Sequence, residues 1–342
     1  MTKKTRRLVT IHDVAKASGV SVSTISRVLN QKSDVAEETQ QRVLEVIQQL
    51  GYSSNLAARS MRSSRTYMIG LIVPDVEYAY SLEVLKGVNH AIATSDYDLL
   101  IYTTGSFQKQ DTAVHEQQYV SRLNGTVTDG VIVVTPSARS FSSTAPIVSI
   151  DPHVIVENYP TVYVDHYQGA VEAVRYLVEL GHRRIAYITG RSGMQNSERY
   201  RAYCDVLAEA GIPYDPDLVH EGDYSIDCGT VGARVLLALP DRPTAIFAAN
   251  DQTAIGVSEA VEQLGVRIPD DLSLIGFDNI PEARFYQLTS VDHPLMQMGM
   301  MAVELLIKAI EGQTIEETIT KIPTRLVVRK SCQALAENVK SL

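Results

Sequence analysis

The chain has 342 residues and a formal net charge of −9, but its charges are unevenly distributed. Residues 1–62 carry ten lysines and arginines against five acidic residues, whereas the remainder carries 21 against 35. This pattern indicates a nucleic-acid-binding segment joined to an acidic, soluble body, and the length allows two or three domains with sizeable cores. The cysteines lack CxxC or zinc-finger spacing, which argues against a disulfide framework or a metal site; they are Cys204, Cys228 and Cys332.

The start of the chain does not predict export. The basic stretch 3–7 resembles the first part of a signal peptide, and taken alone it also suits a solvated terminus. The segment 9–18 that follows has no uninterrupted apolar run and no cleavage site. No other segment is typical of a membrane span, so we expect a cytoplasmic protein.

Residues 10–30 predict two short helices joined by a tight turn. Apolar residues recur at helical spacing over 11–15 and again over 25–29, while Gly19 allows the turn between them and Ser21 can cap the second helix. In a helix-turn-helix, the N-terminal side chains of the second helix contact base edges in the major groove. Helical hairpins also build ordinary cores, so the spacing alone is a weak signal. The exposed face of the second helix would consist of Val22, Ser23, Ser26 and Arg27.

Beyond the polar stretch 62–66, which has the composition of a linker, apolar runs alternate with amphipathic helical patterns. Alternation of this kind predicts parallel, doubly wound sheets with helices on both faces. Such sheets bind ligands beyond the carboxyl ends of their strands. The expected strands are 66–73, 99–104, 129–134, 161–165, 183–190, 244–250 and 272–277, and the expected helices are 81–93, 111–123, 170–180, 200–210 and 252–265.

Polar side chains near several expected strand ends are candidate ligand contacts. Carboxylates and a bidentate guanidinium suit adjacent hydroxyl groups, so this set predicts a polyhydroxylated ligand. An aspartate at a strand end can instead cap the next helix, and for Asp165 and Asp251 this alternative is nearly as good. His153 and His166 are expected at the surface or behind the ligand contacts. The candidate set is Asp165, Arg199, Tyr224, Asp251 and Asp278.

No constellation of residues predicts an enzyme. The glycine-containing loop 190–193 lacks both the GxGxxG and the GxxxxGK[ST] spacing, so it supports no nucleotide cofactor. The histidines and serines form no recognisable nucleophile pattern. The expected function is therefore binding, with no cofactor and no metal.

The chain resembles the lac repressor family through most of its length. The segments that carry the resemblance, in the family's order, are TIHDVAKASGVSVSTISRVLN, RVLEVIQQLGY, NLAARSMRS, MIGLIVPDV, DGVIVV, LGHRRIAYITG, AIFAANDQTAIG, RIPDDLSLIGFDN and TRLVVRKSC. The resemblance implies an N-terminal all-α helix-turn-helix domain over 1–53, a hinge helix and linker over 54–66, and an effector-binding and dimerisation body over 67–342. The body would be an α/β, periplasmic-binding-protein-like domain of two doubly wound parallel-sheet lobes, the first about 67–164 plus 295–321 and the second about 165–293 plus 322–342.

The resemblance assigns DNA contacts to particular residues. Val22 and Ser23 occupy positions that set base preference, and Arg27 would reach a guanine. Other positions match residues that contact phosphates and anchor the domain without selecting a sequence. The matching residues are Thr10, Asn30, Tyr52 and Asn55.

The implied hinge helix departs from the family pattern at one position. Met61 stands where the family has a leucine that wedges into the minor groove, and methionine should preserve the wedge. Ala58 would allow close approach to the groove, and Arg62 would follow Met61 into it. Packing of Met61 against the body is the alternative.

The resemblance also implies a small effector, such as a sugar, between the lobes, with Tyr80 and Tyr224 stacking on it. Tyr80 could instead cover the end of a sheet. A twofold dimer would bind a palindromic operator, and the residues after Val328 are too few for a tetramerising coiled coil. The expected function is therefore a sequence-specific transcriptional regulator, a repressor gated by that effector. A family member gated by a protein partner, such as a phosphocarrier protein, remains the alternative. A sugar-transport receptor is contradicted by the helix-turn-helix.

Overall fold

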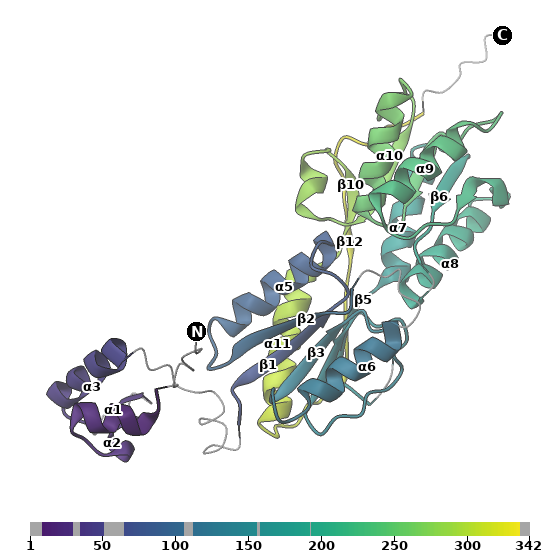
Figure 1. Cartoon of the computed structure of the whole chain (residues 1–342). Coiled ribbons are helices and arrows are strands. Elements are labelled where there is room, and N and C mark those ends of the chain that lie inside the picture. Colours follow the sequence, from purple (N-terminus) through teal and green to yellow (C-terminus); the bar gives the residue numbers. More distant parts are fainter. Residues whose placement is uncertain are drawn as a thin grey trace, which may run out of the picture. The chain divides into compact units, whose positions relative to one another are not determined.

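A computed structural model of the chain describes residues 9–29, 35–50, 65–105, 112–155, 158–191 and 193–335. Its internal contacts divide it into two units, Met1–Thr66 and Tyr67–Leu342. Figure 1 shows the helices and strands of both units, and each unit encloses its own hydrophobic core.

The described part of the first unit contains α1 (Ile11–Ser18), α2 (Val22–Leu29) and α3 (Glu37–Leu50). Each helix has an apolar stripe, and burying the three stripes against one another is what holds such short helices together in water. The third helix begins at Glu37, ahead of the segment RVLEVIQQLGY that carries part of the family resemblance. The core consists of Val14, Ile25, Val28 and Val43.

Local contacts set the ends of α1 and α2. Thr10 and Asp13 cap α1 reciprocally, with Thr10 N donating to Asp13 Oδ2 at 2.8 Å and Asp13 N donating to Thr10 Oγ1 at 3.4 Å. Gly19 then adopts a φ of +70°, a left-handed conformation that ends the helix. Ser21 Oγ accepts a hydrogen bond from Thr24 N at 3.1 Å, as predicted for a cap. The predicted helix-turn-helix is confirmed.

The body contains two six-stranded sheets, and each sheet is the centre of one lobe. The first sheet has the order β11-β5-β4-β3-β1-β2 and is parallel throughout. The second has the order β12-β10-β9-β8-β6-β7 and is parallel except for β12, which runs antiparallel to β10. First-lobe strands are β1 (Met68–Val73), β2 (Asp98–Thr103), β3 (Gly130–Val134), β4 (Ile147–Ile150), β5 (Thr161–Val164) and β11 (Ile319–Ile322). Second-lobe strands are β6 (Ile185–Ile188), β7 (Val219–His220), β8 (Ala245–Ala248), β9 (Ser273–Asp278), β10 (Thr289–Asp292) and β12 (Arg325–Val327).

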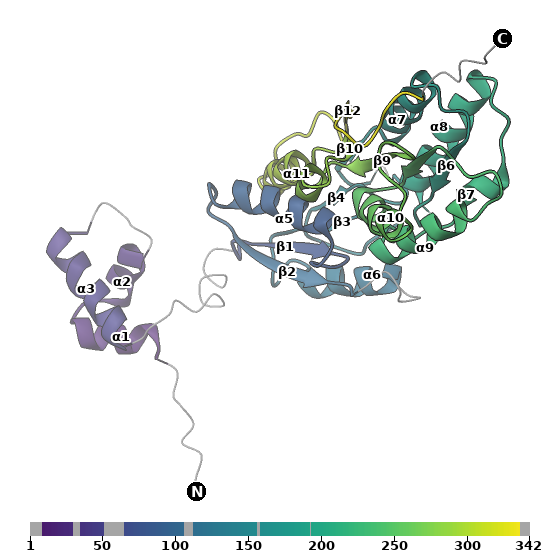
Figure 2. The ribbon, with the colours of Figure 1, turned by 90° about the horizontal axis from the view of Figure 1, so that it is seen from above.

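Helices cover both faces of each sheet (Figure 2). In β3, Ile132 and Val134 pack toward one helical layer, and Val131 and Val133 pack toward the other. Burial on both faces explains why these strands are continuous apolar runs, and the predicted fold class is confirmed. The first-lobe layers are α5 (Ala79–Ile92) with α11 (Leu295–Ile310), and α6 (Thr112–Leu123). The second-lobe layers are α7 (His166–Glu179) with α8 (Met194–Glu209), and α9 (Ile226–Leu237) with α10 (Asp251–Gln263).

The chain crosses between the lobes three times, from β5 to α7, from β10 to α11 and from β11 to β12. His166 is the first residue of α7 after the first crossing, and His293 lies within the second crossing. These two histidines are therefore placed where the lobes join. In the part of the chain that the structure describes, no helix is long and apolar enough to cross a bilayer.

Candidate functional site

A cavity of about 650 Å³, part of it open to solvent, is lined by residues from both lobes. The first-lobe wall comes from the start of α5 and from the segments after β3 and β4. The second-lobe wall comes from the loop before α8, from α8 itself, and from the carboxyl ends of other second-lobe strands. A concave site with convergent polar groups suits a small molecule. The lining residues are Tyr78, Tyr80, Ser81, Thr135, Asp151, His153, Arg191, Gln195, Arg199, Tyr224, Asn250, Gln252 and Asp278.

Backbone conformation also singles out this cavity. Thr135, Asp151, Tyr224 and Asp278 all have positive φ angles, of 46°, 50°, 70° and 102°. Such a conformation costs a residue with a side chain about 1–3 kcal/mol, and strain of this kind gathers at functional sites. The fold holds four lining residues in costly conformations, which indicates that their side-chain directions matter.

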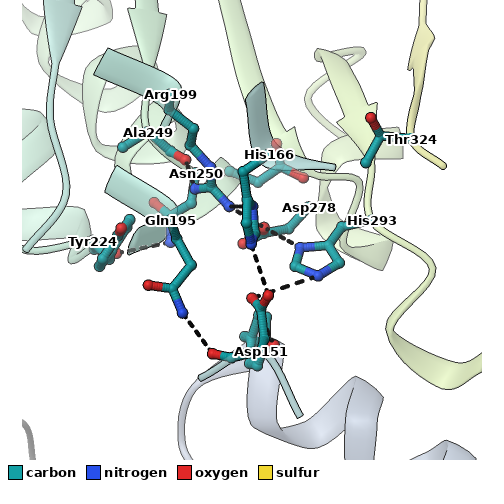
Figure 3. A network of polar contacts seen from close by, with 12 residues as sticks. Asp151, His166, Gln195, Arg199, Tyr224, Ala249, Asn250, Asp278, His293 and Thr324 are labelled. Atoms are coloured by element: carbon teal, nitrogen blue, oxygen red, sulfur yellow. Dashed lines mark hydrogen bonds and ion pairs between the residues drawn. The ribbon is translucent and has the colours of Figure 1, made fainter. Parts of the chain in front are cut away.

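Asp151 is the centre of the first-lobe wall. Its carboxylate accepts hydrogen bonds from Tyr80 Oη at 3.2 Å and from His166 Nε2 at 2.7 Å. Its carbonyl oxygen accepts one from Gln195 Nε2 at 2.5 Å, and Figure 3 shows the contacts with His166 and Gln195. Burial acts to raise the pKa of Asp151, but His166 beside it has the opposite effect, and the net result is a pKa of about 2. Asp151 is therefore an ionised carboxylate in neutral solution.

Arg199 is the centre of the second-lobe wall, and its side chain is almost fully buried. One guanidinium nitrogen donates to the carbonyl oxygen of Ala249, and Nη2 lies 3.2 Å from His166 Nδ1 and 3.8 Å from Asp278 Oδ1. The guanidinium also stacks 3.7 Å above the ring centre of Phe277, a cation–π arrangement. Its position is thus fixed from several sides before any ligand arrives.

The contacts of His166 define its tautomer. A guanidinium can only donate, so His166 Nδ1 accepts from Arg199 and the proton must lie on Nε2, which donates to Asp151. Burial lowers the pKa of His166, Asp151 opposes this effect, and Arg199 adds to the lowering. His166 is therefore a neutral ring that joins the arginine of one lobe to the aspartate of the other.

The ring of Tyr224 covers bare backbone at Gly190. A Cβ atom on Gly190 would lie 1.9 Å from Tyr224 Cζ, so only glycine leaves room for the ring. Asn250 holds the same segment, because its Nδ2 donates to the Tyr224 carbonyl oxygen at 3.1 Å while its Oδ1 caps α10. The tyrosine is consequently presented to the cavity by two neighbouring strand ends.

Four of the six predicted ligand contacts lie together in the cavity wall, and two do not. Asp165 lies outside the cavity lining; it caps α7 by accepting from Gln168 N at 3.0 Å, which is the capping alternative, and it pairs with Lys321 at 2.7 Å. Asp251 is fully buried and also lies outside the cavity lining. The four residues that line the cavity are Tyr80, Arg199, Tyr224 and Asp278.

Asp251 supports the cavity wall from behind. Its carboxylate accepts from Ile280 N at 2.9 Å and from Ser290 Oγ at 2.6 Å, which ties α10 to the segment after β9 and to β10. Burial, and after it the negative charge of Asp278, raises the pKa of Asp251 well above its ordinary value. The cap of α10 is its neighbour Asn250.

Sequence reasoning missed the residues that follow β4. Asp151 and His153 line the cavity, whereas the histidine was expected at the surface or behind the contacts. The short apolar run 146–150 was the available signal, since a polar residue after it fits a strand end. Arg199 lies inside α8, which begins at Met194 rather than at the predicted 200. Gln195 therefore stands one helical turn before Arg199 on the same face.

Replacing Asp151 with asparagine should lower the stability of the body at pH 7 and flatten its acid dependence. The amide nitrogen cannot accept the hydrogen bond that one carboxylate oxygen accepts now, a loss of about 1–3 kcal/mol. Because the pKa of Asp151 falls from 3.8 to about 2 on folding, its stabilising effect is complete above pH 4 and is lost as the pH falls toward 2. Denaturant unfolding at pH 7, 4 and 3 measures both effects. Equal pH slopes in the two proteins would contradict this assignment.

In the first unit, the predicted DNA contacts on α2 differ in exposure. Ser23 and Arg27 are exposed, and Val22 is half-buried. Thr10 is exposed at the N-cap of α1. The other predicted DNA contacts lie outside the described residues; they are Asn30, Tyr52, Asn55, Ala58, Met61 and Arg62.

The donor set of the cavity suits an organic molecule. It offers carboxylates, guanidinium groups, amides and phenols, which are groups that bind hydroxyls by several directed hydrogen bonds. Among the residues that the structure describes, no group of three histidine, cysteine or acidic side chains could hold a metal ion.

Comparison with known proteins gives matches to both units. Residues 10–55 match the model of bacterial regulatory proteins of the lacI family, and residues 174–332 match the periplasmic binding protein-like domain. Catabolite control protein A of Priestia megaterium is 32% identical over 333 residues, covering 94% of this chain and 99% of that protein. The ribose operon repressor of Halalkalibacterium halodurans is 34% identical over 330 residues, covering 95% and 97%.

A solved structure shows the same likeness. The transcriptional regulator CelR in complex with cellobiose is 29% identical in sequence and superimposes with a TM-score of 0.69, covering 94% of this chain and 99% of that one. The likeness therefore extends over both units and most of the chain.

Proposed function

Because this chain belongs to the lacI family of bacterial regulatory proteins, we propose that it is a cytoplasmic repressor that binds a palindromic operator as a homodimer. A small polyhydroxylated molecule in the cavity between the lobes controls that binding. Ligand and operator are thus bound by different units of one chain, which is the arrangement that allosteric control needs.

The polar network that joins the two cavity walls is the observation that carries the ligand proposal. Arg199 and Asp278 offer a cation and a carboxylate side by side, while Tyr80 and Tyr224 offer aromatic faces. Sugars combine adjacent hydroxyls with apolar ring faces, so they match both kinds of group. The likeness to a regulator that binds cellobiose supports this ligand class.

The exposed face of α2 supports the DNA proposal. Ser23 and Arg27 are exposed on a helix whose opposite side is buried in the core of the unit. A helix held in this way can enter the major groove without unfolding the unit. Residues 1–62 also carry the basic charge that contacts with phosphates require.

Exposed apolar side chains support the homodimer. Phe285 is 86% exposed, a degree that is costly for so large an apolar side chain. If two copies associated about a twofold axis, such side chains of both copies would be buried at the interface. The twofold axis would also match the symmetry of a palindromic operator. The exposed apolar side chains on α9 and directly after the short helix η2 (Pro281–Arg284) are Ile226, Val231, Val235, Phe285 and Tyr286.

A thermal-shift screen of the full chain against sugars, sugar phosphates and nucleobases tests the ligand class. A ligand present at a hundred times its Kd stabilises the native state by about 2.7 kcal/mol, so a compound that binds in the cavity is easily detected. We expect a neutral sugar to give the largest shift. A shift with nucleobases alone would contradict the proposed ligand class.

Removing residues 1–66 should abolish operator binding and leave a soluble dimer. The basic charge and α2 lie in the removed unit, whereas the cavity and the exposed apolar side chains remain. Gel shifts of the full chain and of residues 67–342, with sedimentation of both, measure the two properties. The truncated chain must still respond to the ligand in the thermal screen, which controls for misfolding. Operator binding by the truncated chain would contradict the assignment of DNA binding to the first unit.

A further inference from the structure

His293 lies between two aspartates that belong to different lobes. It stands in the crossing from β10 to α11, and its side chain is fully buried. Nδ1 is 3.1 Å from Oδ1 of Asp278 in the second lobe, and Nε2 is 3.8 Å from Oδ2 of Asp151 in the first (Figure 3). One imidazole ring thus faces both cavity walls from behind.

Only one of these two contacts is a complete hydrogen bond. The distance from Nδ1 is within hydrogen-bonding range, whereas 3.8 Å from Nε2 is too long. Nε2 is buried and has no hydrogen-bond partner in the described part of the chain. A buried polar atom without a partner is unfavourable. Both neighbours of the ring are carboxylates, which only accept, and a ring with one proton can donate to only one of them at a time. The contact of His293 with one aspartate therefore depends on its contact with the other.

The neighbours of His293 hold the ring in place. Tyr80 meets it edge-on at a centroid distance of 5.4 Å, and His166 meets it at 5.6 Å with an interplanar angle of 80°. Phe277 lies at 6.1 Å, nearly perpendicular. Rings from both lobes therefore enclose the imidazole. If it moved together with one aspartate, its distance to the other aspartate would change.

His293 also stands directly before a helix that carries changes into the first lobe. Pro294 follows it and α11 begins at Leu295. The first turn of α11 packs closely on α5, because a Cβ atom on Gly87 would lie 2.0 Å from the Met296 carbonyl oxygen. A shift of His293 is therefore felt at the contact between α11 and α5.

We propose that His293 is a positioning residue that couples Asp278 in the ligand-contacting wall of the second lobe to Asp151 in the first. A ligand that forms a hydrogen bond with Asp278 changes the hydrogen bond between Asp278 and His293. The imidazole ring transfers that change to Asp151 and to α11. The ligand part of this inference rests on the proposed function. The coupling between the two aspartates does not, because it is a property of the chain alone.

A double-mutant cycle on the full chain tests the coupling without any ligand. Asp151→Asn, Asp278→Asn and the double variant are unfolded with denaturant, in the wild-type background and in a His293→Leu background. Each substitution changes the unfolding equilibrium constant by a factor. With His293 present, we expect the factor for the double variant to differ at least fivefold from the product of the factors for the two single variants. Without it, the difference should fall to about twofold, because the connection through His166 and Arg199 remains. Equal coupling in the two backgrounds would overturn the proposal.

Two further variants separate coupling from general stability. His182 is also buried, but it contacts Thr244 and Ser273 within the second lobe. His182→Leu should therefore lower stability and leave the coupling between the two aspartates unchanged. His293→Gln keeps one donor and one acceptor, so it should restore part of the coupling and provides a second test if His293→Leu does not fold. If His182→Leu also loses the coupling, or if His293→Gln shows no coupling at all, His293 has only a structural role.

D-Ribose and cellobiose serve as probes for the ligand part. Whichever probe changes the operator affinity of the wild type should act at least threefold more weakly on His293→Gln, while its own Kd stays within threefold. An unchanged response would contradict the role of His293 in signalling. If neither probe affects operator binding, that result counts against the proposed sugar ligand, and the mutant cycle still decides the coupling.

Discussion

Replacing Arg199 with alanine should abolish ligand binding in the cavity and destabilise the body by about 3–5 kcal/mol, the usual cost of breaking a buried charged pair. The guanidinium is the common partner of Ala249, His166 and Asp278, and its side chain is only 4% exposed. Without it, Asp278 becomes a buried carboxylate that lacks its nearest cation. Calorimetry with the ligand and denaturant unfolding measure the two effects.

Two variants make the Arg199 experiment specific. Arg175→Ala removes an exposed arginine that pairs with Glu209, and such a surface pair contributes only about 0–1 kcal/mol. Arg199→Lys keeps the charge but loses the planar fork, so it should bind ligand weakly. Operator affinity in the absence of ligand should resemble that of the wild type, because the DNA-binding unit is unchanged. Normal ligand binding by Arg199→Ala would remove this residue from the site.

Replacing Arg27 with alanine should remove base discrimination more than general DNA affinity. An arginine that donates two hydrogen bonds to guanine is worth about 1–3 kcal/mol of discrimination. Arg27 is exposed on α2, whose other side is fixed in the core, so its loss should not unfold the unit. Affinities for operator and for scrambled DNA, compared at one salt concentration, give the discrimination directly.

Arg42 offers a matched control in the same unit. It is exposed on α3 and carries the same charge, so Arg42→Ala should change operator and scrambled DNA by similar factors. Equal losses on both DNAs for Arg27→Ala as well would mean that Arg27 touches only the backbone of the duplex.

The first unit could be predicted from sequence because its signals are local. Thr10, Gly19 and Ser21 act within three or four residues of themselves, so caps and turn are visible in the chain. The second lobe was harder. α9 contains Gly229 and Gly232, which weaken a helical pattern, and a Cβ atom on Gly229 would lie 2.0 Å from the Thr253 carbonyl oxygen. The helix forms because it packs closely on α10, a contact that sequence periodicity does not contain.

The cavity could be predicted only in part, because a strand end does not specify where its side chain points. Asp165 and Asp278 both end strands, yet one caps a helix and the other lines the cavity. The positive φ of Asp278 turns its carboxylate, and nothing in its sequence neighbourhood required that conformation. His293 depends on still more distant information, since its two carboxylate neighbours come from different lobes.

The central claim is that a molecule bound in the cavity controls DNA binding by the other unit. The most direct measurement is an operator titration of the full chain at fixed salt, with and without the sugar identified by thermal shift, repeated on Arg199→Ala. The ligand should change the operator Kd of the wild type at least tenfold, which corresponds to about 1.4 kcal/mol of coupling. It should leave the Kd of the variant unchanged. A wild-type chain that is saturated with ligand and binds the operator with unaltered affinity would contradict the account.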